Sequence, residues 1–101
     1  MMGWANKYIE SLKAGKTVSF RPKGSSMTGK IESGQLCTVS PVIKENVGVG
    51  DIVLCKVNGN QYLHLVKATQ GDRFCIGNNK GHINGWVSFN CIYGKLIKVE
   101  D

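Results

Sequence analysis

The sequence predicts one all-β domain that carries a short α-helix at its N-terminus. The chain has 101 residues, enough for one modest hydrophobic core and too few for a second. Short runs of β-branched and aromatic residues are separated by turn residues, which is typical of strands joined by tight turns. Strands do not alternate with helical segments, so a doubly wound, nucleotide-binding sheet is not expected.

The helix is expected within residues 1–15, ahead of a β body that covers residues 16–101. Apolar and aromatic residues recur at helical spacing from Trp4 to Lys13 and would share one side of a helix. They are Trp4, Tyr8, Ile9 and Leu12. Gly15 is a typical C-terminal stop. The apolar stripe is expected to pack on the body of the domain, and the alternative is that it docks a partner.

The strands are expected where β-branched and apolar residues gather between turn signals. They are Thr17 to Arg21, Leu36 to Ser40, Asp51 to Val57, Gln61 to Thr69, Arg73 to Ile76 and Cys91 to Val99. The Asn58-Gly59 pair predicts a hairpin, because it adopts positive φ at little cost. Gly77 to Gly85 is expected to be a loop, and Gly94 a bulge or bend. The turn signals together predict about seven short strands.

Composition points to a soluble, cytoplasmic protein without a membrane segment. The hydrophobic fraction is 42%, and no apolar run approaches the roughly 20 residues of a membrane helix. The first ten residues are mixed in character and are not typical of a secretory signal.

The cysteines and histidines predict neither a metal site nor a bound cofactor. Each of the four cysteines lies in an apolar run, and none forms a Cys-x-x-Cys pair. They are therefore interpreted as core thiols of a reducing compartment in preference to disulfides. No zinc-ligand spacing and no glycine-rich phosphate loop with its lysine occur.

The formal net charge is +6, and basic residues cluster in the first third of the chain. They are Lys13, Lys16, Arg21, Lys23 and Lys30. Such a patch can bind nucleic acid or an acidic protein, and the alternative is an ordinary solvated face. Aromatic residues do not interleave with the basic ones as a single-strand binding surface requires, so nucleic acid is the less favoured partner.

The stretch from Lys23 to Lys30 is the strongest candidate for a catalytic element. Gly24 permits a sharp turn before the Ser25-Ser26 pair, and a serine on such a turn can present its hydroxyl to a base. An ordinary surface loop is the alternative, because these residues are common in turns.

The candidates for the base are His64, Lys67 and His82. Side chains alternate along a strand, so His64 and Lys67 cannot both point at Ser26 from a regular strand. A lysine must be desolvated to lose its proton near neutral pH, whereas histidine titrates there already. Lys67 falls near a strand end, where water is expected. His64 is therefore favoured as the base, and the alternative is a half-buried structural histidine.

Several short motifs follow one another along the chain. They are Gly24-Ser25-Ser26-Met27, Gly34-Gln35-Leu36, Val49-Gly50-Asp51-Ile52-Val53, Tyr62-Leu63-His64-Leu65-Val66, Gly77-Asn78-Asn79 and Ile92-Tyr93-Gly94-Lys95. Their order resembles the LexA-like and type I signal peptidase superfamily of serine peptidases, in particular the short, unanchored members of phages and bacterial mobile elements. The resemblance covers nearly the whole chain after residue 16 and implies a mainly antiparallel, coiled sheet or partly open barrel.

The resemblance implies a site as well as a fold. Ser26, the serine before the methionine, would be the nucleophile, and His64 would be the base, as in the histidine-type signal peptidases. The backbone around Gly24 and Ser25 would support the oxyanion. The histidine-type enzymes have an aspartate where Asn78 stands, and Asn78 could orient His64 without stabilising an imidazolium.

The expected function is therefore cleavage of a peptide bond by a Ser-His dyad, without metal or cofactor. The expected partner is a protein or peptide substrate, and a host protein is one candidate. The alternative is a catalytically weak or inactive member that acts as a protein-binding factor of a phage or mobile element, interfering with host or defence proteins. Asn78 and the Thr28-Gly29 pair, which replaces a usual proline, both favour this alternative.

Overall fold

The strands that the structure describes all belong to one antiparallel sheet, in the order β1-β2-β7-β3-β4-β5-β6. The computed structural model describes residues 3–101. The helix α1 spans Asn6–Lys13, and the strands are β1 Val18–Phe20, β2 Leu36–Ser40, β3 Ile52–Val57, β4 Asn60–Gln70, β5 Arg73–Gly77, β6 Ile83–Ser88 and β7 Ile92–Glu100. Two short 3₁₀-helices lie at Lys44–Asn46 and Phe89–Cys91.

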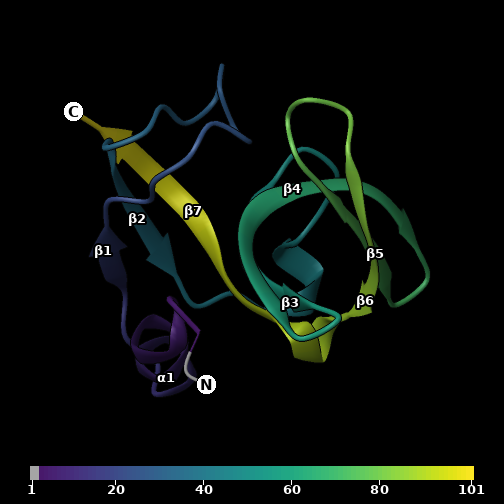
Figure 1. Cartoon of the computed structure of the whole chain (residues 1–101). Coiled ribbons are helices and arrows are strands. Elements are labelled where there is room, and N and C mark those ends of the chain that lie inside the picture. Colours follow the sequence, from purple (N-terminus) through teal and green to yellow (C-terminus); the bar gives the residue numbers. More distant parts are fainter. Residues whose placement is uncertain (1–2) are drawn as a thin grey trace.

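The sheet is strongly curved and remains open. In Figure 1, β4 bends around an interior that it shares with β3, β5 and β6, whereas α1, β1 and β2 lie on the opposite side of the molecule. The edges of the sheet are β1 and β6, which do not pair with each other. The predicted fold class, an all-β domain with a short N-terminal helix, is confirmed.

The strand β3 separates two hydrophobic clusters. Ile52 and Leu54 face a helix-side cluster, and Val53 and Cys55 face a hairpin-side cluster on the other side of the strand. The helix-side cluster contains Ala5, Ile9, Leu12, Phe20, Met27, Ile31, Cys37, Val39, Ile52, Leu54, Leu63 and Leu65. The hairpin-side cluster contains Val47, Val53, Cys55, Val57, Val66, Phe74, Ile76, Val87 and Ile92. Burial of both faces explains why β3 is a nearly continuous apolar run.

The strand β7 joins the two parts of the sheet. Its first half pairs with β3 and its second half with β2, and Gly94 lies just before the crossing point. A Cβ atom on Gly94 would lie 2.7 Å from both the carbonyl oxygen of Ser40 and Cγ1 of Val39. Glycine is therefore required here because the neighbouring strand approaches closely.

The structure differs from the sequence prediction mainly in β6. Residues 77–85 were expected to form a loop, but the strand β6 begins at Ile83 and pairs with β5. Asn84-Gly85 resembles a turn signal, yet Gly85 has φ 147° at the point where the β5–β6 register shifts. The pair thus marks an irregularity within a strand.

The helices of the described residues include none that is both long and apolar enough to cross a membrane.

Replacement Gly94→Ala should lower the free energy of unfolding by about 1–3 kcal/mol, because the added methyl group meets backbone and a packed valine. Gly48→Ala is the matched control, since nothing lies within 4 Å of a Cβ atom there and its φ is not positive. Urea denaturation of the two variants measures the difference. Equal stability of the two would contradict the close approach at Gly94.

Candidate functional site

His64 is positioned by the hairpin of β3 and β4. Asn58 and Gly59 have φ values of 51° and 81°, which is the two-residue turn favoured in hairpins. This turn fixes the register in which Val53 lies opposite His64. The imidazole stacks on the ring of Tyr62, with ring centroids 4.8 Å apart, and His64 is only 7% exposed.

Ser26 lies on a turn that is anchored in the helix-side cluster. Gly24 opens the turn with φ 111°, a conformation that favours glycine. The backbone N–H of Thr28 then donates to the carbonyl of Ser25, and that of Ile31 donates to the carbonyl of Met27. Met27 and Ile31 are buried, whereas Ser26 stays partly exposed. The apolar residue after the serine therefore holds the turn against the sheet.

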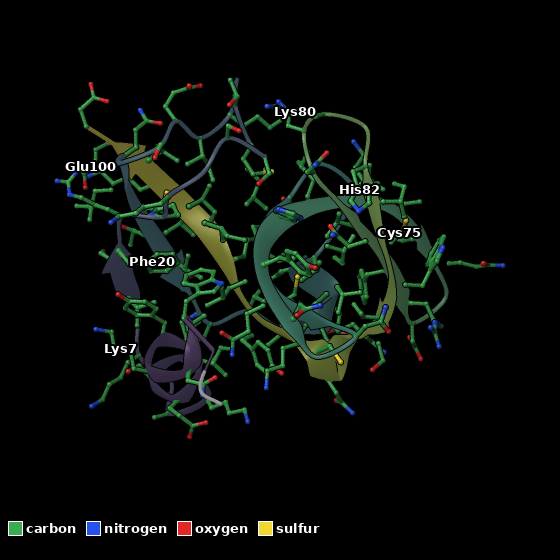
Figure 2. The ribbon with its side chains drawn as sticks, in the orientation of Figure 1. Lys7, Phe20, Cys75, Lys80, His82 and Glu100 are labelled. Carbon is green, nitrogen blue, oxygen red and sulfur yellow. The ribbon has the colours of Figure 1, made fainter. Side chains whose placement is uncertain are left out.

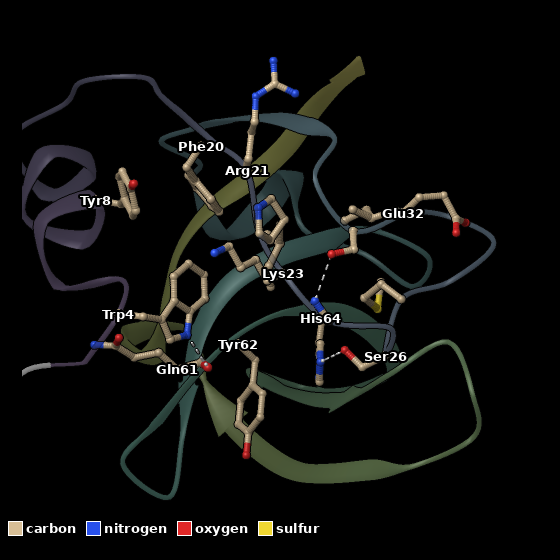
Figure 3. Close-up of a pocket in the computed structure, with 16 residues that line it drawn as sticks. Trp4, Tyr8, Phe20, Arg21, Lys23, Ser26, Glu32, Gln61, Tyr62 and His64 are labelled. Atoms are coloured by element: carbon tan, nitrogen blue, oxygen red, sulfur yellow. Dashed lines mark hydrogen bonds between the residues drawn. The ribbon is translucent and has the colours of Figure 1, made fainter. Parts of the chain in front are cut away.

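Ser26 and His64 come together although 38 residues separate them in sequence. Oγ of Ser26 lies 3.1 Å from Nε2 of His64 (Figure 3). On the other side of the ring, Nδ1 lies 2.7 Å from Oδ1 of Asn84. An amide oxygen only accepts hydrogen bonds, so Nδ1 carries the proton and Nε2 accepts from the Ser26 hydroxyl. The arrangement is that of a nucleophile, a base and an orienting group.

The orienting residue is Asn84 and not Asn78, which corrects the prediction from sequence. Oδ1 of Asn78 accepts from the backbone N–H groups of Lys80 and His82 at 2.8 and 2.9 Å. Asn78 therefore shapes the loop between β5 and β6, where Lys80 and His82 lie (Figure 2). Asn84 was missed because it was assigned to that loop. The sequence signal for this role is an amide side chain, and Asn78 and Asn84 both have one. Asn84 reaches His64 because it lies in β6, which begins at Ile83.

Asn79 is a second residue that the sequence analysis did not single out. Its backbone N–H donates to the carbonyl of Ser26 at 3.0 Å, and its side-chain Nδ2 donates to the carbonyl of Thr28 at 2.8 Å. Lys67, the rejected base candidate, donates from Nζ to the carbonyl of Asn78 at 3.1 Å. The β5–β6 loop is thus bonded both to the serine turn and to β4.

Gly24 and Ser25 were expected to support an oxyanion through their backbone. The N–H of Gly24 donates to Oγ of Ser33 at 3.3 Å, so this donor is already engaged. The N–H groups of Ser25 and Ser26 make no hydrogen bond within residues 3–101. Those two donors are therefore free to bind another group. Oγ of Ser25 also accepts from Nζ of Lys80 at 3.4 Å.

A cleft of about 430 Å³ opens onto the Ser26–His64 pair. Residues 61–64 of β4 line one side and the serine turn lines another, while Trp4, Tyr8 and Phe20 form an aromatic wall. Figure 3 shows these groups around Ser26 and His64. Residues 3–101 contain no group of three or more His, Cys, Asp or Glu side chains that would hold a metal ion.

Burial lowers the pKa of His64 below its ordinary value, because the protein interior disfavours the charged imidazolium. The hydrogen bond to Asn84 opposes this effect, and the nearby His82 adds to it. The imidazole is therefore neutral near pH 7, which is the form that accepts a proton from a serine.

Comparisons of the chain with protein-family models, with curated proteins and with solved structures found no match.

Replacement Asn84→Asp should raise the pKa of His64 relative to the unmodified protein, because a carboxylate next to Nδ1 stabilises the imidazolium. Asn78→Asp is the matched control and should leave this pKa nearly unchanged, because Asn78 bonds to the loop backbone. Titration of the imidazole resonances by NMR measures both. A larger rise in the Asn78 variant would contradict the assignment of the orienting residue.

The lowered pKa of His64 also predicts how stability depends on pH. Below about pH 6.5 the unfolded chain binds a proton at this imidazole more readily than the folded protein does. His64 therefore makes the free energy of unfolding decrease as the pH falls from about 6.5 towards its lower folded pKa. Urea denaturation at several pH values should show a steeper loss for the unmodified protein than for His64→Gln. Parallel curves for the two proteins would argue against this linkage.

Proposed function

We propose that this protein is a serine peptidase-like hydrolase in which Ser26 attacks a peptide carbonyl and His64 is the base. The observation that carries the proposal is the continuous hydrogen-bonded chain from Ser26 through His64 to Asn84 at the edge of the cleft. The amide of Asn84 fixes the tautomer in which Nε2 faces the serine hydroxyl.

The proposed reaction proceeds by acyl transfer. Oγ of Ser26 bonds to the carbonyl carbon as its proton passes to Nε2 of His64, and the N–H groups of Ser25 and Ser26 stabilise the oxyanion. The imidazolium then protonates the leaving amine, the C–N bond breaks, and an ester to Ser26 remains. Water attacks this ester with His64 again as the base, which releases the acid and restores the serine.

The substrate proposed for this site is an extended peptide that pairs with β4. In the β3–β4 hairpin, Gln61 and Leu63 direct their N–H and C=O groups away from β3. The strand β5 pairs with β4 only from Leu65 onward. Gln61 and Leu63 therefore lie on a free edge that leads to His64, and an added strand there would receive main-chain hydrogen bonds.

Peptide binding without hydrolysis is the second candidate function. Asn84 is uncharged and stabilises an imidazolium less than a carboxylate does, which favours slow or absent turnover. The free edge of β4 and the cleft would still bind an extended segment of a partner protein.

A cytoplasmic location is the third part of the proposal. All four cysteines are free thiols, and three of them are buried. Burial, with the neighbouring Cys91, raises the pKa of Cys55 to about 12, so this thiol stays protonated and unreactive. Buried free thiols are typical of proteins from a reducing compartment.

A fluorophosphonate probe should label the protein, and the label should be on Ser26. Ser26→Ala should abolish labelling, whereas Ser25→Ala should retain it, because Ser25 does not contact the imidazole. His64→Ala should slow labelling by about 10²–10⁴-fold through loss of the base. Mass spectrometry of the labelled protein measures each effect. Absence of serine-dependent labelling in a folded protein would refute the peptidase and leave the binding function.

A further inference from the structure

The residues just before α1 and the first residue of α1 surround the side chain of Gln61 at one end of the cleft. Nε1 of Trp4 donates to the carbonyl of Gln61 at 3.1 Å (Figure 3). The backbone N–H of Ala5 donates to Oε1 of Gln61 at 2.7 Å, and Nε2 of Gln61 donates to Oδ1 of Asn6. A Cβ atom on Gly3 would lie 2.2 Å from Oε1 of Gln61. We call this group of contacts, from Gly3 to Asn6 around Gln61, the Gln61 clasp.

The Gln61 clasp occupies part of the free edge of β4. Gln61 and Leu63 are the residues of this edge whose main-chain groups point away from β3 and have no partner in β5, which pairs with β4 only from Leu65 onward. The carbonyl of Gln61 is already bonded to Trp4, so a peptide strand finds both main-chain groups free only at Leu63. One residue with both groups free pairs with a segment of about three residues.

The ring of Trp4 also lines the cleft at the end where Gln61 lies. It packs edge-on against Phe20, with ring centroids 5.6 Å apart, and Tyr8 stacks on Phe20 at 4.5 Å. Trp4 is still 49% exposed. Because its indole bonds to the carbonyl of Gln61, the ring lies next to the part of the β4 edge that follows Leu63. A peptide that continues past Leu63 meets this ring.

We propose that Trp4 and Gln61 determine the length of peptide that the cleft accepts. A segment of about three residues pairs with Leu63, and the remaining chain turns away at the indole. The inference rests on the proposed function in one respect, namely that the free edge of β4 is where the substrate binds.

NMR titration of the ¹⁵N-labelled Ser26→Ala protein with capped alanine peptides tests this limit. The peptides are acetylated, N-methylamidated chains of about two to about six alanines. They should shift the Leu63 amide, and their affinity should stop rising at about three residues. In the double variant Ser26→Ala/Trp4→Ala, affinity should keep rising with peptide length. The longest peptide should bind about two- to tenfold more tightly than it binds the Ser26→Ala protein, as expected for one freed hydrogen bond.

Two further variants control for folding and for the loss of a tryptophan. Trp4→Phe removes the N–H donor and keeps an aromatic ring against Phe20, and it should give a smaller gain than Trp4→Ala. Trp86→Ala removes an exposed tryptophan on β6, outside the cleft, and should keep the length limit of the Ser26→Ala protein. Dispersed amide spectra establish that each variant is folded.

The possible outcomes separate this inference from the proposed function. Peptides that do not shift Leu63, or a length dependence that neither Trp4 variant changes, would overturn the length limit. A length limit that disappears in Trp4→Ala supports it, even if the fluorophosphonate probe never labels Ser26 in the unmodified protein. Labelling of Ser26 combined with affinity that rises over all peptide lengths would support the hydrolase and overturn the limit.

Discussion

Two hydrogen bonds from Asn79 join the serine turn to the β5–β6 hairpin, and the geometry of the candidate site depends on them. The same hairpin carries Asn84, which holds the imidazole of His64. Ser26 and His64 are therefore both held in place by hydrogen bonds to one hairpin. Each such hydrogen bond contributes about 0.5–1.5 kcal/mol, whereas burial of a side chain such as Met27 contributes about 1.5–3 kcal/mol. Apolar burial thus holds the serine turn on the sheet, and the hydrogen bonds of Asn79 fix the position of the turn relative to the β5–β6 hairpin.

The protonation of His64 reflects a balance between burial and orientation. A buried imidazole loses solvation when it is charged, which lowers its pKa and keeps it ready to accept a proton. Asn84 orients the ring without adding a charge to a half-buried position. This arrangement favours the neutral imidazole over the imidazolium. The site therefore fixes the positions of the two side chains more effectively than it would stabilise a positive charge on the imidazole.

The sequence predicted the parts of the molecule that depend on local pattern. β2 has the bounds that were expected for it, Leu36–Ser40, because β-branched residues end there at a proline. β6 was missed, because Asn84-Gly85 has the composition of a turn and lies within a strand. Asn78 and Asn84 are the same residue type in the same stretch, so only the end of β5 and the start of β6 distinguish their roles.

The predicted helix began at Trp4, but Trp4 lies before α1 and bonds to Gln61, a contact that joins positions 57 residues apart. Local periodicity contains no information about such a contact.

Because the two faces of β3 belong to different hydrophobic clusters, the Ser26–His64 pair depends on both of them. Met27, beside Ser26, belongs to the cluster on one side of this strand, while Tyr62, which stacks on His64, packs with the cluster on the other side. The Ser26–His64 pair therefore lies between two clusters that both β3 and β4 separate. The distance between the hydroxyl and the imidazole therefore depends on the packing of both clusters, so a packing change on either face of the sheet would alter it.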